Sequence, residues 1–417
     1  MLHSPTLAST AVRTQVVRHD SGWQLLRDGK PYLIKGVGGG ASKDLLAKVG
    51  GNSFRTWGAN NLDPQLEEAQ RLGLTITVGL YMAQERRGFN YSDRKQVEEQ
   101  RERIRGEVLR YKDHPAVLMW AIGNEMEGYG KGDNPAVWQA VNEVAQMIRQ
   151  IDPDHPTMTV VAELGGERLN NFIKYCPDVD AIGINSYGRS ATIGQRYREG
   201  GGTKPYIVTE FGPAGIWEIK KNKLGLFEEQ TSTAKGEVFR KAWTENVVTN
   251  RDLCLGAYAF VWGNKQEATA TWFGMLLADG TRLEAVDVMN QLWTGKPPEH
   301  PCPKISPITI SPDTRVDPGG TINAKIDLQS ADSDPLKVEW VLHREQTKFG
   351  QGGDREEEPP SVTNAVVQSD ERSATVKLPA EAGGYRLFVF VHDTHGGGAT
   401  ANIPLWVGEL PTTQAGR

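Results

Sequence analysis

Short apolar runs alternate with longer segments of helical periodicity between residues 32 and 293. Several of the runs are continuously apolar, which is typical of parallel strands that are covered on both faces. The intervening segments space their apolar residues by three and four, which predicts amphipathic helices. The predicted strands are Tyr32–Lys35, Ser53–Trp57, Thr75–Leu80, Val117–Ile122, Thr157–Val161, Ala181–Ile184, Tyr206–Val208 and Leu255–Val261.

Eight such strand and helix units predict an α/β fold, a closed (β/α)₈ TIM barrel over residues 21–295. An open doubly wound sheet has the same alternation, but it normally carries a phosphate-binding glycine fingerprint after its first strand. The glycine-rich segment in that position, Gly36–Gly40, lacks the GxGxxG spacing. The pattern therefore favours the barrel.

The pattern changes after Trp293. Residues 296–304 are rich in proline, which cannot continue a helix, and predict a linker. Residues 305–410 show alternating strands such as KVEWVLH and YRLFVFVHD between Gly, Pro and Asp turns, which predict an immunoglobulin-like β-sandwich. Residues 1–20 are predicted to be an N-terminal tail.

Composition narrows the range of partners. A net charge of −5 offers no basic surface for nucleic acid, and no apolar run is long enough to cross a membrane. Three scattered cysteines do not fit a disulfide framework or a metal site, and His392, Asp393 and His395 read as solvated turn residues, so no metal or cofactor is predicted. A leader removed earlier would favour the periplasm or secretion, and otherwise the cytoplasm is expected. The oligomeric state is left open.

Two glutamates stand at the ends of predicted strands in similar surroundings. Glu125 closes HPAVLMWAIGNE after the fourth strand, and Glu210 closes KPYIVTE after the seventh. Retaining hydrolysis of a glycosidic bond uses two carboxyl groups about 5 Å apart, one as acid and one as nucleophile. One glutamate at a strand end also fits a salt bridge, but two matched ones favour glycoside chemistry. The residues alone do not decide which of the two carries the proton.

The motifs WAIGNE and TEFG resemble the acid/base and nucleophile motifs of the clan A glycosidases, and within that clan the family 2 barrel. His114 and Pro115 match the His-Pro before the fourth strand, and the likeness extends from about Gly29 to Trp293. The resemblance implies a retaining glycosidase that acts on a β-linked oligosaccharide or polysaccharide. It assigns Glu125 as acid/base and Glu210 as nucleophile.

The resemblance also implies roles for residues beside the glutamates. Asn124 resembles the asparagine that hydrogen-bonds the sugar 2-hydroxyl, and Tyr187 resembles the tyrosine that donates to the nucleophile. Arg55 matches the arginine that ends the second strand, where its charge would favour the ionised form of Glu210. A turn residue and a rim salt bridge are the structural alternatives for Asn124 and Arg55.

Aromatic and polar residues after other strands are candidates for substrate binding. Trp262 matches the tryptophan of the last strand and would stack on a pyranose, with core packing as the alternative. Trp57 would line a further subsite. The Asn264-Lys265 pair resembles the uronate-binding element of β-glucuronidases, although its spacing from the last strand differs. Weaker candidates are Tyr81, Trp217, Asn185, Glu85 and Glu127.

The chain departs from the family in its domain order. Family 2 enzymes place sandwich domains before the barrel, whereas here the predicted sandwich follows it. The sugar, the linkage, the exo or endo preference and the role of the sandwich therefore do not carry over. Two alternatives remain: a transglycosylase (glucanotransferase) that uses the same glutamates, and an inactive carbohydrate-binding protein, which would be expected to lack one of them.

Overall fold

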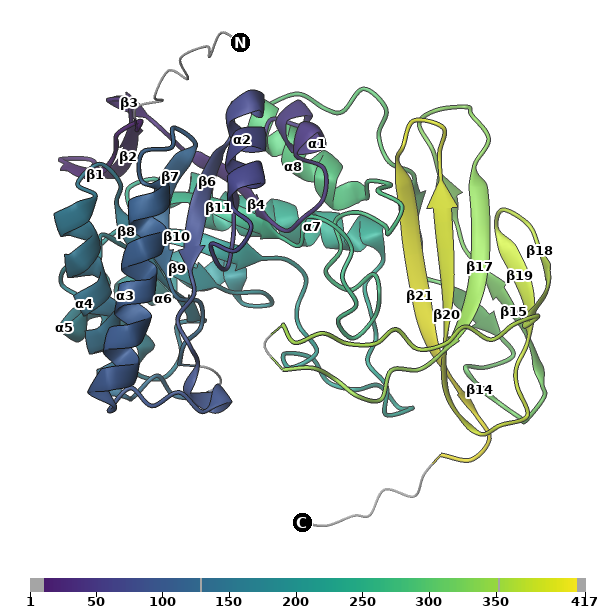
Figure 1. The fold of residues 1–417 in the computed structure, drawn as a ribbon. Helices are drawn as coiled ribbons and strands as arrows, with labels where there is room; N and C mark the ends of the chain where they lie inside the picture. Colours follow the sequence, from purple (N-terminus) through teal and green to yellow (C-terminus); the bar gives the residue numbers. More distant parts are fainter. Residues whose placement is uncertain (1–10, 128–129, 352, 411–417) are drawn as a thin grey trace, which may run out of the picture. The chain divides into compact units, whose positions relative to one another are not determined.

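The computed structural model describes residues 11–127, 130–351 and 353–410 as two compact units (Figure 1). The barrel unit comprises Met1–Phe211 and Lys241–Phe260, and the sandwich unit comprises Gly212–Arg240 and Val261–Arg417. The segments that follow the last two barrel strands thus belong to the sandwich unit. This unit therefore includes residues that precede the linker predicted at residues 296–304. None of the described helices has the length and apolarity needed to cross a membrane.

Eight parallel strands form a closed barrel in the order β10-β11-β4-β5-β6-β7-β8-β9. Their bounds are β4 Ile34–Gly38, β5 Ser53–Arg55, β6 Thr75–Leu80, β7 Val117–Ile122, β8 Thr157–Ala162, β9 Ala181–Asn185, β10 Tyr206–Phe211 and β11 Cys254–Phe260. Every residue of β6, β7 and β10 is buried, as their apolar runs predict. Closure confirms the TIM barrel and excludes the open sheet.

The glycines near the first barrel strand serve packing. A Cβ on Gly36 would lie 2.4 Å from the ring of Tyr258, so a larger residue would collide with this buried tyrosine. Tyr258 in turn contacts the hydroxyl of Ser53 at 3.1 Å inside the barrel. The glycine at this position therefore makes room for an aromatic ring in the barrel interior.

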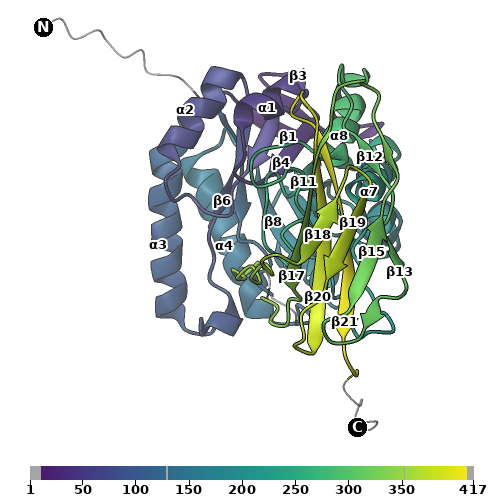
Figure 2. The same ribbon diagram turned by 90° about the vertical axis from the view of Figure 1, so that its right-hand side faces the viewer.

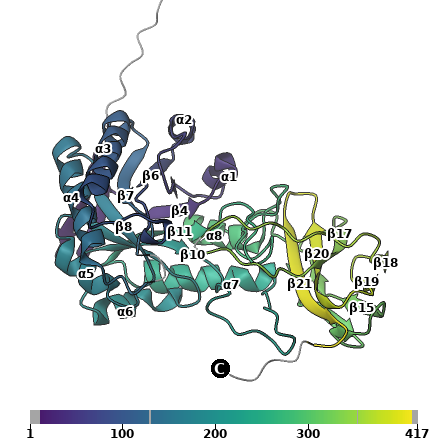
Figure 3. The same cartoon turned by 60° about the horizontal axis from the view of Figure 1, so that its bottom comes forward.

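Helices follow most barrel strands, and Figure 3 shows α3 to α6 along the outside of the barrel strands. Their bounds are α1 Lys43–Lys48, α2 Asp63–Leu72, α3 Arg94–Tyr111, α4 Pro135–Ile151, α5 Arg168–Tyr175, α6 Ile193–Glu199 and α7 Ser232–Trp243, which continues as a π-helical turn over Thr244–Val248. Asp93 caps α3 by accepting from the amides of Lys95 and Gln96. Asn134 caps α4 in the same way, with Pro135 as its first residue.

An antiparallel sheet precedes the barrel. It consists of β1 (Thr14–His19), β2 (Gly22–Arg27) and β3 (Lys30–Pro31), so part of the predicted tail forms a strand. Leu25 of β2 is buried in one apolar cluster with residues of the barrel strands, which include Ile34. Residues 1–10 of the predicted tail lie outside the described residues.

Two four-stranded sheets enclose the second core, as the predicted β-sandwich requires (Figure 2). One sheet has the order β13-β15-β19-β18 and the other β14-β21-β20-β17. Their bounds are β13 Thr309–Ser311, β14 Arg315–Val316, β15 Thr321–Lys325, β17 Lys337–Arg344, β18 Val366–Ser369, β19 Ser373–Lys377, β20 Gly383–His392 and β21 Gly398–Val407. A short pair, β12 (Lys304–Ile305) and β16 (Leu328–Gln329), and α8 (Glu284–Thr294) complete the unit. The sandwich core includes Trp340.

Candidate active site

A sharp backbone turn carries Glu125 beyond the end of β7. Gly123 has a φ of +70° and Glu125 a φ of +51°, both in the left-handed region. A Cβ on Gly123 would lie 1.9 Å from the sulfur of Met126, so a larger residue would have to displace this side chain as well as adopt a strained backbone. Left-handed backbone at a non-glycine residue costs on the order of 1–2 kcal/mol and is concentrated at functional sites. The turn is thus a structural reason to examine Glu125 as a functional residue.

Glu210 lies inside β10 and accepts hydrogen bonds from three donors. Its Oε1 accepts from Arg55 Nη1 at 3.3 Å and from Trp57 Nε1 at 3.0 Å, and its Oε2 accepts from the Tyr187 hydroxyl at 2.6 Å. An ionised carboxylate can only accept, and all three partners donate. The site therefore stabilises negative charge on Glu210. Trp57, predicted to line a subsite, thus donates its indole N–H to this carboxylate.

Arg55 is almost completely buried and binds several groups at once. Its Nη1 also donates to the Thr209 carbonyl at 2.9 Å, and its Nη2 donates to Asn124 Oδ1 at 2.8 Å. A buried guanidinium is costly unless it is paired, and here it forms an ion pair with Glu210. The residue assigned to the sugar 2-hydroxyl, Asn124, is thus held by the same group that pairs with the proposed nucleophile.

Asn185 contacts Glu125 directly and is linked to Glu210 through Arg55. Its Nδ2 donates to Glu125 Oε1 at 2.6 Å, and its Oδ1 accepts from Thr209 Oγ1 at 2.7 Å and from Arg55 Nη1 at 3.3 Å. Because two donors engage the oxygen, the amide is oriented with its nitrogen toward Glu125. The sequence ranked Asn185 as a weak candidate. Its position as a polar residue ending the buried strand β9 was the available signal.

The two carboxyl groups have different electrostatic surroundings. Desolvation by the surrounding protein raises the pKa of Glu125 to about 8, the negative charge of Glu210 acts in the same direction, and the hydrogen bond from Asn185 opposes it. Glu125 therefore holds a proton at neutral pH. Glu210 instead accepts hydrogen bonds from three donors, one of which is the guanidinium of Arg55. The two carboxyl groups thus differ in their hydrogen-bond partners and in their burial.

The raised pKa predicts a pH-dependent stability. The folded chain keeps the proton of Glu125 up to about pH 8, whereas an unfolded glutamate releases it near 4.5. Stability from this proton is fully present below the unfolded value and is lost as pH rises through about 8. The variant Glu125→Gln cannot ionise, so its melting temperature should fall less than that of the native protein between about pH 4 and pH 9, a range that spans both pKa values. Calorimetry over this range tests the difference, with the exposed Glu99→Gln as control. Parallel curves for native and Glu125→Gln proteins would contradict the raised pKa.

Phe260 was not predicted and supports the same site. It ends β11, and its ring meets Trp57 edge-on at a centroid distance of 6.1 Å and Tyr187 at 5.9 Å. Such edge-to-face contacts stabilise defined ring orientations. Phe260 thus packs against two of the side chains that donate to Glu210. Apolar residues ending a strand carry no distinctive sequence signal, which is why Phe260 was missed.

Two further acids of the barrel unit have structural partners. Glu127 Oε1 forms an ion pair with Arg168 Nε at 2.8 Å and accepts from the amide of Ala162 at 2.7 Å. Glu85 Oε1 accepts from Asn134 Nδ2 at 2.7 Å. Both therefore help to fix loops after the barrel strands.

Three further predicted binding residues, Trp262, Asn264 and Lys265, belong to the sandwich unit. Trp262 has no exposed surface, so it offers no ring face for the predicted stacking on a sugar, and core packing is the reading that its burial supports. Asn264 Nδ2 donates to the carbonyl of Ala270 at 2.6 Å. Lys265 Nζ forms an ion pair with Glu267 at 2.6 Å, so a carboxylate of the protein already neutralises its charge.

Two histidines and one aspartate of the sandwich unit form a cluster whose residue types could bind a metal ion. His300, Asp332 and His395 have potential ligand atoms within 4.8 Å of one another, whereas His392 instead pairs with Asp279. The rings of His300 and His395 stack at a centroid distance of 3.6 Å and an angle of 5°. Nitrogen lone pairs lie in the ring plane, so parallel stacked rings do not direct them to a common point. This arrangement is that of stacked, acid-paired imidazoles.

Proteins named β-glucuronidases are similar in sequence to this chain. The β-glucuronidase of Paenibacillus borealis is 24% identical over 244 residues, which cover 50% of this chain and 40% of that protein. The β-glucuronidase of Sus scrofa is 26% identical over 245 residues, covering 50% of this chain and 35% of that protein. The matched region thus covers less than half the length of either relative.

Fold and family comparisons agree with this result. The crystal structure of Ruminococcus gnavus β-glucuronidase is similar with a TM-score of 0.52 and 18% identity, covering 69% of this chain and 53% of that chain, which shows a common fold. The profile described as glycosyl hydrolases family 2, TIM barrel domain, matches residues 43–258. Because that match spans more than half of the chain, this protein belongs to the family 2 glycosyl hydrolases.

Proposed function

We propose that this chain is a retaining β-glycosidase in which Glu210 is the nucleophile and Glu125 the acid/base. The observation that carries the proposal is the contrast between the two carboxyl groups. Glu125 holds a proton at neutral pH, while Glu210 accepts from three donors. Asn185 and Arg55 connect the two by hydrogen bonds. A protonated and an ionised carboxyl group in one site is what double displacement requires.

The first step forms a covalent intermediate. The carboxylate of Glu210 attacks the anomeric carbon while the bond from that carbon to the leaving oxygen breaks, and Glu125 transfers its proton to that oxygen. A glycosyl ester of Glu210 results. Hydrogen bonds from Tyr187 and Trp57 hold the attacking carboxylate in one orientation, which reduces the entropic part of the barrier.

The second step reverses these roles. Glu125, now ionised, takes a proton from a water molecule whose oxygen attacks the anomeric carbon, and the ester bond to Glu210 breaks. Two displacements at one carbon leave the product with the β-configuration of the substrate. An acceptor hydroxyl in place of water would give transglycosylation with the same residues.

The substrate class we propose is a β-linked oligosaccharide or polysaccharide. The similar proteins are named β-glucuronidases, and the Asn264-Lys265 pair resembles their uronate-binding element. However, the ion pair of Lys265 with Glu267 competes with a substrate carboxylate for the same cation. A neutral β-glycoside is therefore as well supported as a β-glucuronide, and both belong in the test.

Product analysis tests the proposal directly. Purified protein is incubated with β-glucans, β-galactosides, β-mannans and β-glucuronides, and the anomer of the first product is read by proton NMR before mutarotation. A β-anomer is expected from the active member of the panel, and longer oligosaccharides would indicate transfer. An α-anomer as first product would overturn the retaining mechanism, and absence of turnover across the panel would overturn the proposed substrate class.

A further inference from the structure

One tryptophan of the sandwich unit is exposed to solvent. The chain contains eleven tryptophans, all within the described residues, and Trp217 alone is exposed, with 59% of its surface accessible. Burial of a large apolar side chain contributes about 1.5–3 kcal/mol to stability, so folding favours covering such a residue. The accessible indole of Trp217 therefore presents apolar ring surface that a bound ligand would cover.

The indole of Trp217 rests on a defined support. Its ring lies 6.1 Å from the ring of Phe273 at an interplanar angle of 31°. A Cβ on Gly215 would lie 2.3 Å from Trp217 Cζ2, so the ring packs directly on the backbone of Gly215. The amide of Gly215 donates to Glu218 Oε2 at 3.0 Å, which closes the turn that carries the indole. Trp217 is thus seated on its own loop while much of its surface stays accessible.

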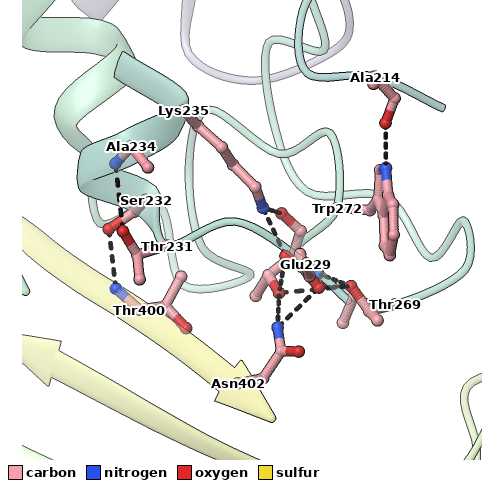
Figure 4. Close-up of polar contacts among 12 residues, drawn as sticks. Ala214, Glu229, Thr231, Ser232, Ala234, Lys235, Thr269, Trp272, Thr400 and Asn402 are labelled. Carbon is pink, nitrogen blue, oxygen red and sulfur yellow. Dashed lines mark hydrogen bonds and ion pairs between the residues drawn. The ribbon is translucent and has the colours of Figure 1, made fainter. Parts of the chain in front are cut away.

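A hydrogen bond holds the segment that carries Trp217, residues 212–231, near its start. Trp272 Nε1 donates to the carbonyl of Ala214 at 2.9 Å (Figure 4). Trp272 is only 3% exposed and lies in the segment that follows β11. The segments after the two last barrel strands are therefore joined to each other just before the turn of Trp217.

The far end of the same segment is anchored by a buried carboxylate. Glu229 Oε2 accepts from Thr269 Oγ1 and Asn402 Nδ2, each at 2.6 Å, and Oε1 accepts from Thr271 Oγ1 at 2.8 Å and pairs with Lys235 Nζ (Figure 4). The charged groups of Glu229 and Lys235 are nearly inaccessible. A buried ion pair is stable only when its remaining hydrogen bonds are satisfied, and here both carboxylate oxygens have two partners.

Two strands of the sandwich also bind the segment of residues 212–231. Asn402 lies on β21 and its Oδ1 accepts from Arg386 of β20 at 2.7 Å, while Arg386 also donates to the carbonyl of Phe227 at 2.7 Å. A bidentate pair with Glu345 compensates the buried guanidinium. Two strands of the sandwich thus hold the segment of Trp217 through buried charged groups. Such a network favours one conformation of the segment.

We propose that Trp217 is a sugar-stacking platform that binds a unit of the glycan other than the one attached at Glu210. The flat face of an indole fits the apolar face of a pyranose, and a preorganised ring loses little entropy on binding. Trp217 follows Glu210 by seven residues, so chain length alone keeps their Cα atoms within about 25 Å. The inference rests on the proposed function, and it implies that the enzyme prefers oligosaccharides to monoglycosides.

A comparison of long and short substrates tests the platform. For the active sugar, kcat/KM is measured on the 4-nitrophenyl monoglycoside and on the β-linked tetrasaccharide. Trp217→Ala should lower the value for the tetrasaccharide about 3- to 10-fold, through KM, and leave the monoglycoside unchanged, and Trp217→Phe should retain most of the effect. Trp406→Ala, a half-buried sandwich tryptophan, is the control. Equal values for native and Trp217→Ala proteins on the tetrasaccharide, or equal losses on both substrates, would overturn the proposal.

Binding without turnover separates this inference from the proposed mechanism. In the Glu210→Gln variant, quenching of tryptophan fluorescence is titrated with cellotetraose, mannotetraose, laminaritetraose and β-1,4-galactotetraose. One of these is expected to quench, and the signal should disappear on adding Trp217→Ala. Quenching that persists in the double variant would overturn the platform, and so would the absence of quenching with every tetrasaccharide. If quenching is intact but the native protein releases an α-anomer as its first product, only the retaining mechanism is overturned.

The support of the platform has its own matched pair of variants. Thr269→Val removes one hydroxyl from Glu229 at nearly constant volume, and Thr269→Ser restores it. Thr400→Val removes another buried hydroxyl, which donates to the carbonyl of Val389 within the sandwich sheet. If the network orients Trp217, Thr269→Val raises KM for the tetrasaccharide but Thr269→Ser and Thr400→Val do not. Equal KM values for Thr269→Val and Thr400→Val would show that the network only stabilises the fold.

Discussion

Replacement of Glu210 by glutamine is expected to lower kcat/KM by about 10⁴-fold or more, the scale seen when a nucleophile is removed. The amide carries no negative charge and cannot form the glycosyl ester. It also disturbs the donors around it, because an amide nitrogen placed toward Tyr187, Trp57 or Arg55 meets a donor instead of an acceptor. Initial rates on the active substrate of the panel measure the loss.

The matched control for this change is Glu127→Gln. Glu127 is also a buried carboxylate of the barrel unit with an arginine partner, but that partner is Arg168 and the pair fixes a loop. Its replacement should lower the melting temperature and leave kcat/KM within about 10-fold of native, in line with loss of a structural pair. If Glu127→Gln and Glu210→Gln lost activity equally, or if Glu210→Gln kept native rates, Glu210 would not be the nucleophile.

Replacement of Glu125 by glutamine is expected to act according to the leaving group. With a poor leaving group such as a sugar alcohol, the first step needs the proton of Glu125, and kcat/KM should fall by about 10²- to 10⁴-fold. With 2,4-dinitrophenol, whose oxyanion leaves without protonation, the first step should stay near the native rate. The intermediate then accumulates, because no base assists water, and a burst of dinitrophenol precedes slow turnover.

The pH profile provides the second signature of Glu125. In the native protein kcat/KM on the poor leaving group should decline above about pH 8, where Glu125 loses its proton. Glutamine has no proton to lose, so the decline should be absent in Glu125→Gln with the dinitrophenyl glycoside. Equal loss for both leaving groups, or an unchanged basic limb in the variant, would show that another group is the acid.

Much of the barrel followed from local pattern. The bounds predicted for the strands at Thr75–Leu80 and Val117–Ile122 agree with β6 and β7, because continuous apolar runs bounded by polar residues are read directly from the chain. The seventh strand was predicted too short, ending at Val208, whereas β10 continues to Phe211. Threonine and glutamate at the end of the strand interrupt the apolar run, yet both are buried inside the barrel.

The site could be predicted only in part. Glu125 and Glu210 were predicted because polar residues after buried strands stand out, and motif resemblance assigned their roles. The donor role of Trp57 toward Glu210 and the link through Asn185 were not predicted, because they depend on side-chain directions from different strands. Trp262 was expected to meet a sugar and is instead completely buried, since exposure is a property of the packed fold.

The sequence by itself determined the alternation of strands and helices, the change to a sandwich after the proline-rich segment and the two candidate carboxyl groups, because these depend on the order and spacing of residues along the chain. The tertiary structure alone decided that burial raises the pKa of Glu125 and that Glu210 receives three hydrogen-bond donors. It also decided that the segment after Glu210 is held by Asn402 and Arg386, which lie more than 150 residues further along the chain. Desolvation, hydrogen bonding and buried ion pairs depend on distances in space, and folding brings together residues that no local pattern connects.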